Sequence, residues 1–206
     1  MAQRFDIHLH TCRHSSCSQL DEWQLIATAA GAGLDGLVIT EHHYQWTDEE
    51  LRELAEASGV PGFVVLAGFE YTSRQGDILV YGLPAEATDG LEPYEDAFTV
   101  LERFHAAGAF CVAAHPTRAG MGFDESIAHM PFDALEVASA NLQPHEQRLA
   151  AKLANGLGKP GITASDAHQL RDVGLYGIEF QDLVHSAFDL QQALKHGRFR
   201  VAGRMR

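Results

Sequence analysis

Short apolar segments alternate along the chain with longer helix-like stretches, and this alternation limits the possible folds most strongly. Eight segments have the composition of buried strands: 5–10, 36–40, 63–70, 78–82, 110–115, 135–138, 161–165 and 176–180. Most of them are continuous apolar runs, as expected of parallel strands that are buried on both faces. Repeated strand–helix–strand units imply right-handed crossovers and a parallel sheet, either open or closed.

Helical patterns fill the stretches between these segments. They cover residues 20–32, 47–58, 95–107, 144–155 and 189–195. Thr47 and Glu50 have the spacing of a capping box, and this stretch stops at Gly59-Val60-Pro61. Because no linker, low-complexity tract or repeat interrupts the pattern, we expect a single domain over residues 1–206.

Histidines and acidic residues gather where the strand-like segments end. They form four short clusters and one single position: Asp6-Ile7-His8-Leu9-His10, Glu41-His42-His43, Ala114-His115-Pro116, Ser165-Asp166-Ala167-His168, and Glu70. His8 and His10 are two residues apart and therefore share one face of a strand. Catalytic groups of parallel barrels sit at the carboxyl ends of the strands, and the first and last strands of a barrel are neighbours. A closed barrel is therefore favoured over an open sheet.

Imidazole and carboxylate groups are the usual protein ligands of zinc, manganese and iron. A lone histidine at a strand end is usually an ordinary loop residue, and Glu70 by itself could be a solvated strand end. Five such positions together predict a metal centre, because a buried cluster this rich in charge needs compensating cations.

Composition excludes some classes of partner. The net charge of −13 disfavours broad binding to nucleic-acid backbones, although a short nucleic acid stays possible. No apolar stretch has the length of a membrane span. We expect no secretory signal before the first strand-like segment, and no protein partner is evident. The odd count of cysteines, Cys12, Cys17 and Cys111, favours free thiols and a cytoplasmic location. Four arginines at 198, 200, 204 and 206 indicate a frayed, solvated terminus.

The clusters, in this order, resemble the PHP family (polymerase and histidinol phosphatase), in its small stand-alone form. The resemblance covers nearly the whole chain and rests on His8-Leu9-His10-Thr11, Thr40-Glu41-His42, Gly68-Phe69-Glu70, Ala114-His115-Pro116, Ser165-Asp166-Ala167-His168 and Asp172-Val173-Gly174. It implies a distorted (β/α)7 barrel, TIM-like and with parallel strands, whose site lies at the carboxyl ends of the strands. It also implies two or three divalent metal ions (Zn, Mn or Fe).

The resemblance further implies which residues hold these ions. One ion would be held by His8, His10, Glu70 and Asp166, a second by Glu70 and His115, and a third by His42 and His168. The chain departs from the family pattern at three places. Asp77 stands where many relatives have a histidine and could itself ligate. His14, Ser15 and Ser16 stand where others have an aspartate, and Glu41 replaces an aspartate and is expected to orient a ligand histidine.

By this resemblance we expect a phosphoesterase that hydrolyses a small phosphomonoester or nucleotide-type phosphate through a metal-activated hydroxide. His168 and His43 are the candidates for assisting the leaving group. The candidates for holding the phosphorylated substrate follow ligand segments in the chain: Arg13, His14, Arg118 and Arg171.

Three alternatives stay open. An amidohydrolase-type deacylase or deaminase would share the barrel, but such enzymes often need a carboxylated lysine, and no lysine lies on a candidate strand. A nuclease or nucleotide-bisphosphate phosphatase of the same family would use the same pocket. A metal-binding barrel without enzymatic activity is the third alternative.

Overall fold

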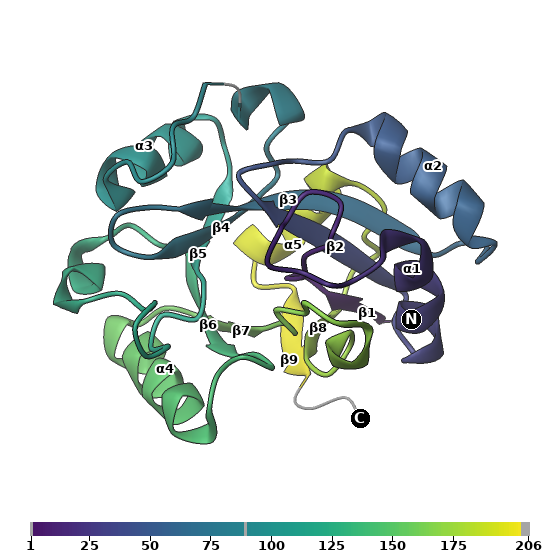
Figure 1. The fold of residues 1–206 in the computed structure, drawn as a ribbon. Coiled ribbons are helices and arrows are strands. Elements are labelled where there is room, and N and C mark those ends of the chain that lie inside the picture. Colours follow the sequence, from purple (N-terminus) through teal and green to yellow (C-terminus); the bar gives the residue numbers. More distant parts are fainter. Residues whose placement is uncertain (1, 89, 203–206) are drawn as a thin grey trace.

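The computed structural model describes residues 2–88 and 90–202 (Figure 1). Within them it has nine strands, five α-helices and three 3-10 helices. The strands are β1 Gln3–Asp6, β2 Gly36–His42, β3 Val64–Thr72, β4 Asp77–Tyr81, β5 Phe110–Ala113, β6 Ala134–Ala138, β7 Gly161–Thr163, β8 Gly177–Phe180 and β9 Phe199–Ala202. The helices are α1 Glu22–Gly31, α2 Asp48–Ser58, α3 Ala97–Ala106, α4 Pro144–Leu157 and α5 Ala187–Lys195, with η1 Ala85–Thr88, η2 Glu125–His129 and η3 Leu170–Asp172.

All nine strands form one sheet in the order β7-β6-β5-β4-β3-β2-β1-β8-β9. A parallel bridge between Leu9 and Ala167 joins the segments that follow β1 and β7. The Thr163 hydroxyl of β7 donates hydrogen bonds to the carbonyls of Gly177 in β8 and Ala202 in β9. These contacts bring the two ends of the sheet together, so the sheet is nearly closed. The predicted barrel-like α/β fold is therefore confirmed.

The strand directions differ from the all-parallel prediction. β1, β2 and β3 run parallel to one another, as do β5, β6 and β7, but β4 is antiparallel to both of its neighbours. β8 and β9 also form antiparallel pairs, with β1 and with each other. The turn between Thr72 and Asp77 is too short for a crossover helix, so the chain reverses there as a hairpin. The number of seven β/α units is accordingly not confirmed.

Each stretch predicted to be helical contains a helix. In α2 the Thr47 side chain accepts from the Glu50 N–H, the Glu50 side chain accepts from the Thr47 N–H, and Gly59 ends the helix in the left-handed conformation. The prediction of a frayed terminus is wrong for Arg198 and Arg200. The latter lies in β9, and both pair with acidic side chains at 2.9 Å. Arg204 and Arg206 lie outside the described residues.

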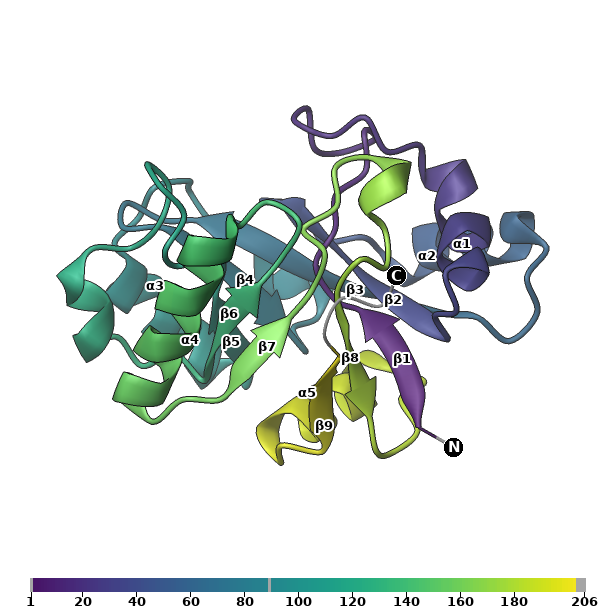
Figure 2. The same cartoon turned by 90° about the horizontal axis from the view of Figure 1, so that it is seen from below.

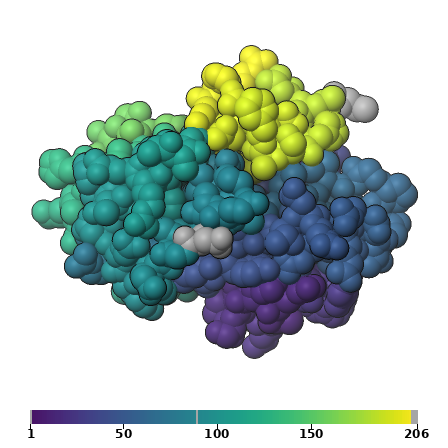
Figure 3. All heavy atoms as spheres, turned by 90° about the horizontal axis from the view of Figure 1, so that it is seen from above, coloured from purple at the N-terminus to yellow at the C-terminus, as the bar shows by residue number. Residues whose placement is uncertain are grey.

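The core has three buried clusters. One fills the barrel interior and continues onto α5, which contributes Leu190, Ala193 and Leu194. The other two lie between the sheet and its covering helices, with α3 and α4 on one side and α1 and α2 on the other (Figures 1 and 2). Seen from above, the C-terminal segment packs directly on the middle of the chain (Figure 3). No helix in the described residues is long and apolar enough to cross a membrane.

Candidate metal centre

The predicted ligands meet at one edge of the sheet. They come from six places in the fold: the segment after β1 (His8, His10), the end of β2 (His42), β3 (Glu70), the start of β4 (Asp77), the segment after β5 (His115) and the segment after β7 (Asp166, His168). Because β4 runs antiparallel to β3, its first residue lies at the same edge as the end of β3. The hairpin therefore adds a carboxylate to a site that is otherwise built from the ends of parallel strands.

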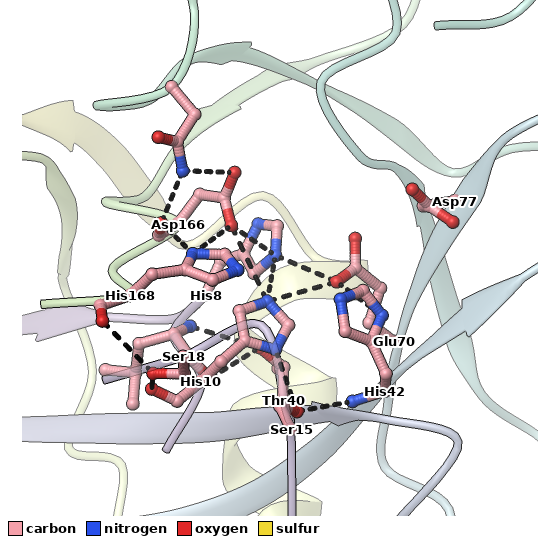
Figure 4. Close-up of polar contacts among 12 residues, drawn as sticks. His8, His10, Ser15, Ser18, Thr40, His42, Glu70, Asp77, Asp166 and His168 are labelled. Atoms are coloured by element: carbon pink, nitrogen blue, oxygen red, sulfur yellow. Dashed lines mark hydrogen bonds and ion pairs between the residues drawn. The ribbon is translucent and has the colours of Figure 1, made fainter. Parts of the chain in front are cut away.

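Four side chains surround a single point at the centre of this edge (Figure 4). His8 Nε2 lies 3.4 Å from a Glu70 oxygen and 3.4 Å from Asp166 Oδ1. His10 Nε2 lies 3.1 Å from the same Glu70 oxygen and 3.5 Å from the same Asp166 oxygen. The residues expected to hold the first ion are thus brought together, and all four are buried.

The other oxygen of Glu70 faces a second group. It lies 3.3 Å from His115 Nε2, and that nitrogen is 3.8 Å from an Asp77 oxygen. One ligand atom each from Glu70, Asp77 and His115 lies within 4.8 Å of the others. Glu70 therefore stands between two groups of ligands, as a bridging carboxylate would.

A third group consists of His10, His42 and His168, whose ligand nitrogens also lie within 4.8 Å of one another. The imidazole of His10 stacks on that of His42, with ring centroids 4.5 Å apart, and its centroid is 4.6 Å from that of His168. His42 and His168 are partly exposed, so this group faces the solvent side of the site. His14 does not join it.

Unpaired polar atoms in this cluster fit bound cations. Both oxygens of Glu70, Oδ1 of Asp77 and Nδ1 of His42 are buried, and each lacks a hydrogen-bond partner among the described residues. A buried polar atom without a partner costs about 1–3 kcal/mol, and more if it is charged. Divalent metal ions would supply the missing partners for these donor atoms, which have the chemistry that zinc, manganese and iron prefer.

The electrostatics of the ligands point the same way. Burial alone would lower the pKa of His8, but Asp166, Glu136 and Glu70 raise it well above the ordinary range. Burial would raise the pKa of Glu70, but His8 and His42 hold it well below its ordinary value. In the metal-free protein, protons on these imidazoles neutralise the carboxylates, and bound cations would replace those protons.

Glu136, in the middle of β6, is a site residue that sequence reasoning missed. One of its oxygens lies 2.9 Å from His8 Nδ1, and the other accepts a hydrogen bond from the backbone N–H of His115 at 2.8 Å. It is fully buried and touches two of the predicted ligands. The only signal in the sequence is a single acidic residue inside the apolar strand 134–138.

Glu41 lies behind the ligands rather than among them. Its carboxylate accepts hydrogen bonds from the Thr11 N–H and hydroxyl, from the Ser15 hydroxyl at 2.5 Å and from the Trp46 indole at 3.1 Å. The Ser15 oxygen in turn accepts the backbone N–H of His42 at 3.1 Å. Glu41 thereby ties the loop after β1 to the end of β2.

Two of the predicted ligands have strained backbones. His115 has φ of 28° and Asp166 has φ of 52°, which is the left-handed region that residues other than glycine seldom occupy. Asn141, also missed from the sequence, donates hydrogen bonds to the carbonyl of Asp166 at 2.7 Å and to its carboxylate at 2.8 Å. Strain of this kind costs about 1–3 kcal/mol per residue and clusters at functional sites.

The predicted substrate-binding arginines differ in position. Arg118 reaches the cluster, with Nη1 at 3.7 Å from an Asp166 oxygen and the side chain partly exposed. The side chain of Arg171 is 76% exposed and lies beside that of Asp172. Both residues belong to η3. Only Arg118 is therefore in direct contact with a predicted metal ligand.

Arg13 and His14 lie together on the rim of the site. The Arg13 guanidinium sits over the Trp46 ring at 5.1 Å, and both Arg13 and His14 approach Glu50 at 3.5 and 3.4 Å. The His14 ring stacks on Tyr44 with centroids 3.8 Å apart. These two residues form an aromatic and basic rim rather than a part of the ligand groups.

His43 follows His42 but points elsewhere. Its ring packs edge-on against Tyr71, with centroids 5.1 Å apart, and its Nε2 accepts the Thr72 N–H at 3.4 Å. Burial lowers the pKa of His43, which keeps the imidazole neutral. It belongs to none of the three ligand groups.

The surface of the described residues has a small hollow and a larger one that bear on the site. A small one of about 240 Å³ adjoins the centre and is lined by Asp77, the β3–β4 turn and residues 120–122. A larger groove of about 1160 Å³ lies between α2, β3 and the start of α5, and it includes none of the predicted site residues. The small hollow is thus the one that opens beside a predicted ligand, Asp77.

A family model for the PHP-associated region, PHP_C, matches residues 144–199. No curated protein matches the chain. Among solved structures, a two-domain protein of Bacteroides vulgatus that contains a predicted PHP-like metal-dependent phosphoesterase is similar, with a TM-score of 0.72 and 18% identity. That similarity covers 99% of this chain and 65% of the Bacteroides protein, so the chain spans about two thirds of that protein's length.

Two other structures have similar folds. PsfC from Pseudomonas syringae has a TM-score of 0.71 and 21% identity over 98% of this chain and 91% of its own. The lesion-specific endonuclease PfuEndoQ from Pyrococcus furiosus has a TM-score of 0.70 and 16% identity over 98% of this chain and 58% of its own. At these identities the likeness concerns the fold. Together with the family match, it confirms the resemblance to the PHP family.

Proposed function

From its PHP-like fold and the site at the edge of its sheet, we propose that the chain is a metal-dependent phosphoesterase. Its substrate would be a small phosphomonoester or nucleotide-type phosphate, hydrolysed by a metal-activated hydroxide. The observation that carries this proposal is the position of Glu70, whose two oxygens face His8 and His10 on one side and His115 on the other. One carboxylate shared by two ligand groups is the arrangement of a bridged metal pair.

The ligand groups suggest how the ions would be held. His8, His10, Glu70 and Asp166 would hold the first, Glu70, Asp77 and His115 the second, and His42 and His168 a third. Bound zinc, manganese or iron ions would acidify a water molecule and neutralise charge on phosphoryl oxygens.

The protein's own side chains would orient the substrate. Arg118 lies beside Asp166 and can form a bidentate pair with phosphoryl oxygens, because a guanidinium presents a planar fork of N–H donors. His168 Nδ1 donates to the Asp166 carbonyl at 2.9 Å, which leaves Nε2 free for a ligand or a proton. Burial lowers the pKa of His168, which keeps its imidazole neutral and able to bind a metal ion. His43, whose ring packs against Tyr71, is the second candidate that the sequence gives for assisting the leaving group.

Size and charge favour a small substrate. The hollow beside Asp77 has a volume of about 240 Å³, and the chain carries a net charge of −13, which repels long polyanions.

Cleavage at the ends of short nucleic acids is the second candidate. It is favoured by the shared fold of PfuEndoQ and of the endonuclease Q complex with a 27-mer duplex, which has a TM-score of 0.64. The free thiols of Cys12, Cys17 and Cys111 support a cytoplasmic location.

The test is Asp166→Ala, with Asp182→Ala as control. Asp182 is an exposed aspartate that pairs with Arg198 and belongs to none of the ligand groups. We expect Asp166→Ala to lose metal retention and turnover of p-nitrophenyl phosphate while its circular dichroism stays native. Asp182→Ala should keep both properties. Full activity of Asp166→Ala would refute the assignment.

A panel of phosphomonoesters, short oligonucleotides and amides then separates the alternatives. Hydrolysis of phosphomonoesters supports the main proposal, and cleavage restricted to oligonucleotide ends supports the nuclease. Amide hydrolysis alone would indicate an amidohydrolase-type enzyme. Retention of metal without hydrolysis of any compound would leave a metal-binding barrel that is not an enzyme.

A further inference from the structure

A second group of metal-binding side chains lies at the opposite edge of the sheet. His105, Cys111 and Asp133 offer ligand atoms that lie within 4.8 Å of one another. Cys111 is the second residue of β5, whereas His115 follows the other end of that strand. Four residues of extended chain span roughly 13 Å, so these side chains cannot share an ion with the centre around Glu70.

Three elements hold this group together. His105 lies in the last turn of α3, Cys111 in β5 and Asp133 directly before β6. His105 Nε2 is 2.9 Å from Asp133 Oδ2, and the Cys111 N–H donates to the same oxygen at 2.8 Å. The Asp133 N–H donates to the Cys111 carbonyl at 2.9 Å. Both contacts between Cys111 and Asp133 use the backbone of Cys111, and neither engages its thiol.

The group combines a buried thiol with access from solvent. Cys111 is 0% exposed, whereas the side chains of His105 and Asp133 are 28% and 32% exposed. A thiol sulfur, an imidazole nitrogen and a carboxylate oxygen are all zinc ligands. Soft thiolate ligands select zinc over manganese, magnesium and calcium, so the selectivity of this group differs from that of the centre around Glu70.

We propose that His105, Cys111 and Asp133 form a second zinc site that fastens α3 to β5 and to the start of β6. The three side chains leave a fourth position for water. On binding, a bond forms between zinc and the Cys111 sulfur, and the thiol proton passes to solvent. The competing explanation is that the His105–Asp133 pair alone ties α3 to the sheet.

Cobalt(II) titration of the whole chain tests the proposal. A thiolate bound to cobalt gives a charge-transfer absorption in the near ultraviolet, which imidazole and carboxylate ligands do not give. We expect this band in the native protein, its loss in Cys111→Ser, and its persistence in the Cys12→Ser/Cys17→Ser double variant, which removes the two exposed thiols. The proposal is overturned if the native protein lacks the band, if Cys111→Ser keeps it, or if the double variant loses it.

His105→Gln provides a second test. It leaves the buried Cys111 unchanged and therefore serves if Cys111→Ser fails to fold. It is made in the Asp166→Ala background, which weakens the other centre. We expect zinc to raise the Tm of the Asp166→Ala protein, and this rise to become smaller when His105→Gln is added. If the His105–Asp133 pair were merely structural, His105→Gln would lower Tm equally with and without zinc, and that result would overturn the proposal.

Discussion

Glu136 accepts a hydrogen bond from His8 Nδ1 at 2.9 Å, in a contact that joins the middle of β6 to the segment after β1. This contact places the proton of a neutral His8 on Nδ1. The free nitrogen, Nε2, then faces Glu70 and Asp166, each at 3.4 Å. A carboxylate that orients a ligand imidazole in this way also strengthens the imidazole as a ligand.

Glu136→Gln tests this role. The glutamate offers one oxygen to His8 and the other to the His115 N–H, whereas a glutamine has a single oxygen and would set its NH₂ group against one of these donors. We expect metal affinity, measured by titration calorimetry with manganese, to fall by about 10–100-fold. Glu179→Gln, which alters a glutamate paired with the exposed Arg200, is the matched control and should leave the affinity unchanged. Equal affinities in the two variants would remove Glu136 from the centre.

The positions of the predicted ligands follow from the sequence because they depend on simple rules. Polar residues that close an apolar strand lie at its end, and residues two apart share a face, as His8 and His10 do. Neither rule needs knowledge of the partner strands. The same holds for α2, whose capping signals at Thr47 and Glu50 are local.

Other features depend on tertiary context. The run 78–82 reads the same in either direction, so its antiparallel course in β4 could not be predicted, and neither could the antiparallel pairs of β8 and β9. Glu136 resembles any polar residue in a strand until His8 is found against it. β9 was missed because Arg200 interrupts its short apolar run at the edge of the sheet.

The stability of the metal-free protein should depend on pH on both sides of neutrality. Burial alone would lower the pKa of His10, but contacts with Asp166 and Glu70 raise it to about 9 from the ordinary 6.5. Protonated His10 therefore stabilises the fold fully below pH about 6.5, and this contribution is lost as pH rises through about 9. Glu70, whose pKa is lowered from 4.5, contributes above that pH and loses its contribution in more acidic solution.

Urea denaturation in the presence and absence of a chelator checks this dependence. Between pH about 6.5 and about 9 we expect the metal-free protein to lose unfolding free energy on the order of 3 kcal/mol. With manganese bound, the imidazoles are already deprotonated, so the loss should shrink. A metal-free protein of constant stability across this range would contradict the proton-for-cation exchange.

Arg118→Ala should affect substrate binding more than metal binding. The guanidinium lies 3.7 Å from Asp166 but is partly exposed and is not itself a ligand, so its removal leaves the ligand groups intact. We expect KM for a phosphomonoester to rise about tenfold or more, which corresponds to about 1.4 kcal/mol of lost binding, with unchanged metal content. Arg52→Ala on α2, whose side chain is 64% exposed, is the control. A larger effect of Arg171→Ala than of Arg118→Ala would reverse the assignment of the phosphate-binding arginine.

Asp77→Asn should remove the second ion and leave the first ion bound. Asp77 lies 3.8 Å from His115, but the groups that hold the first ion, His8, His10 and Asp166, do not include it. We expect the variant to retain the first ion and to lose the second, so that metal content after gel filtration falls by about one ion per chain. The hydrolysis rate should fall with it, because paired ions act together on the attacking and leaving oxygens.

Acidic solution should remove the second ion from the native protein, as Asp77→Asn does. Burial, with the nearby Glu70 charge, raises the pKa of Asp77 to about 6, and the protonated acid is a poor ligand. Retention of the second ion should therefore weaken as pH falls below about 6, because Asp77 then takes up a proton. In Asp77→Asn this pH-dependent step should be absent. If both ions were lost together in native protein and variant alike, the two ligand groups would form one inseparable site, and Asp77 would have no separate role.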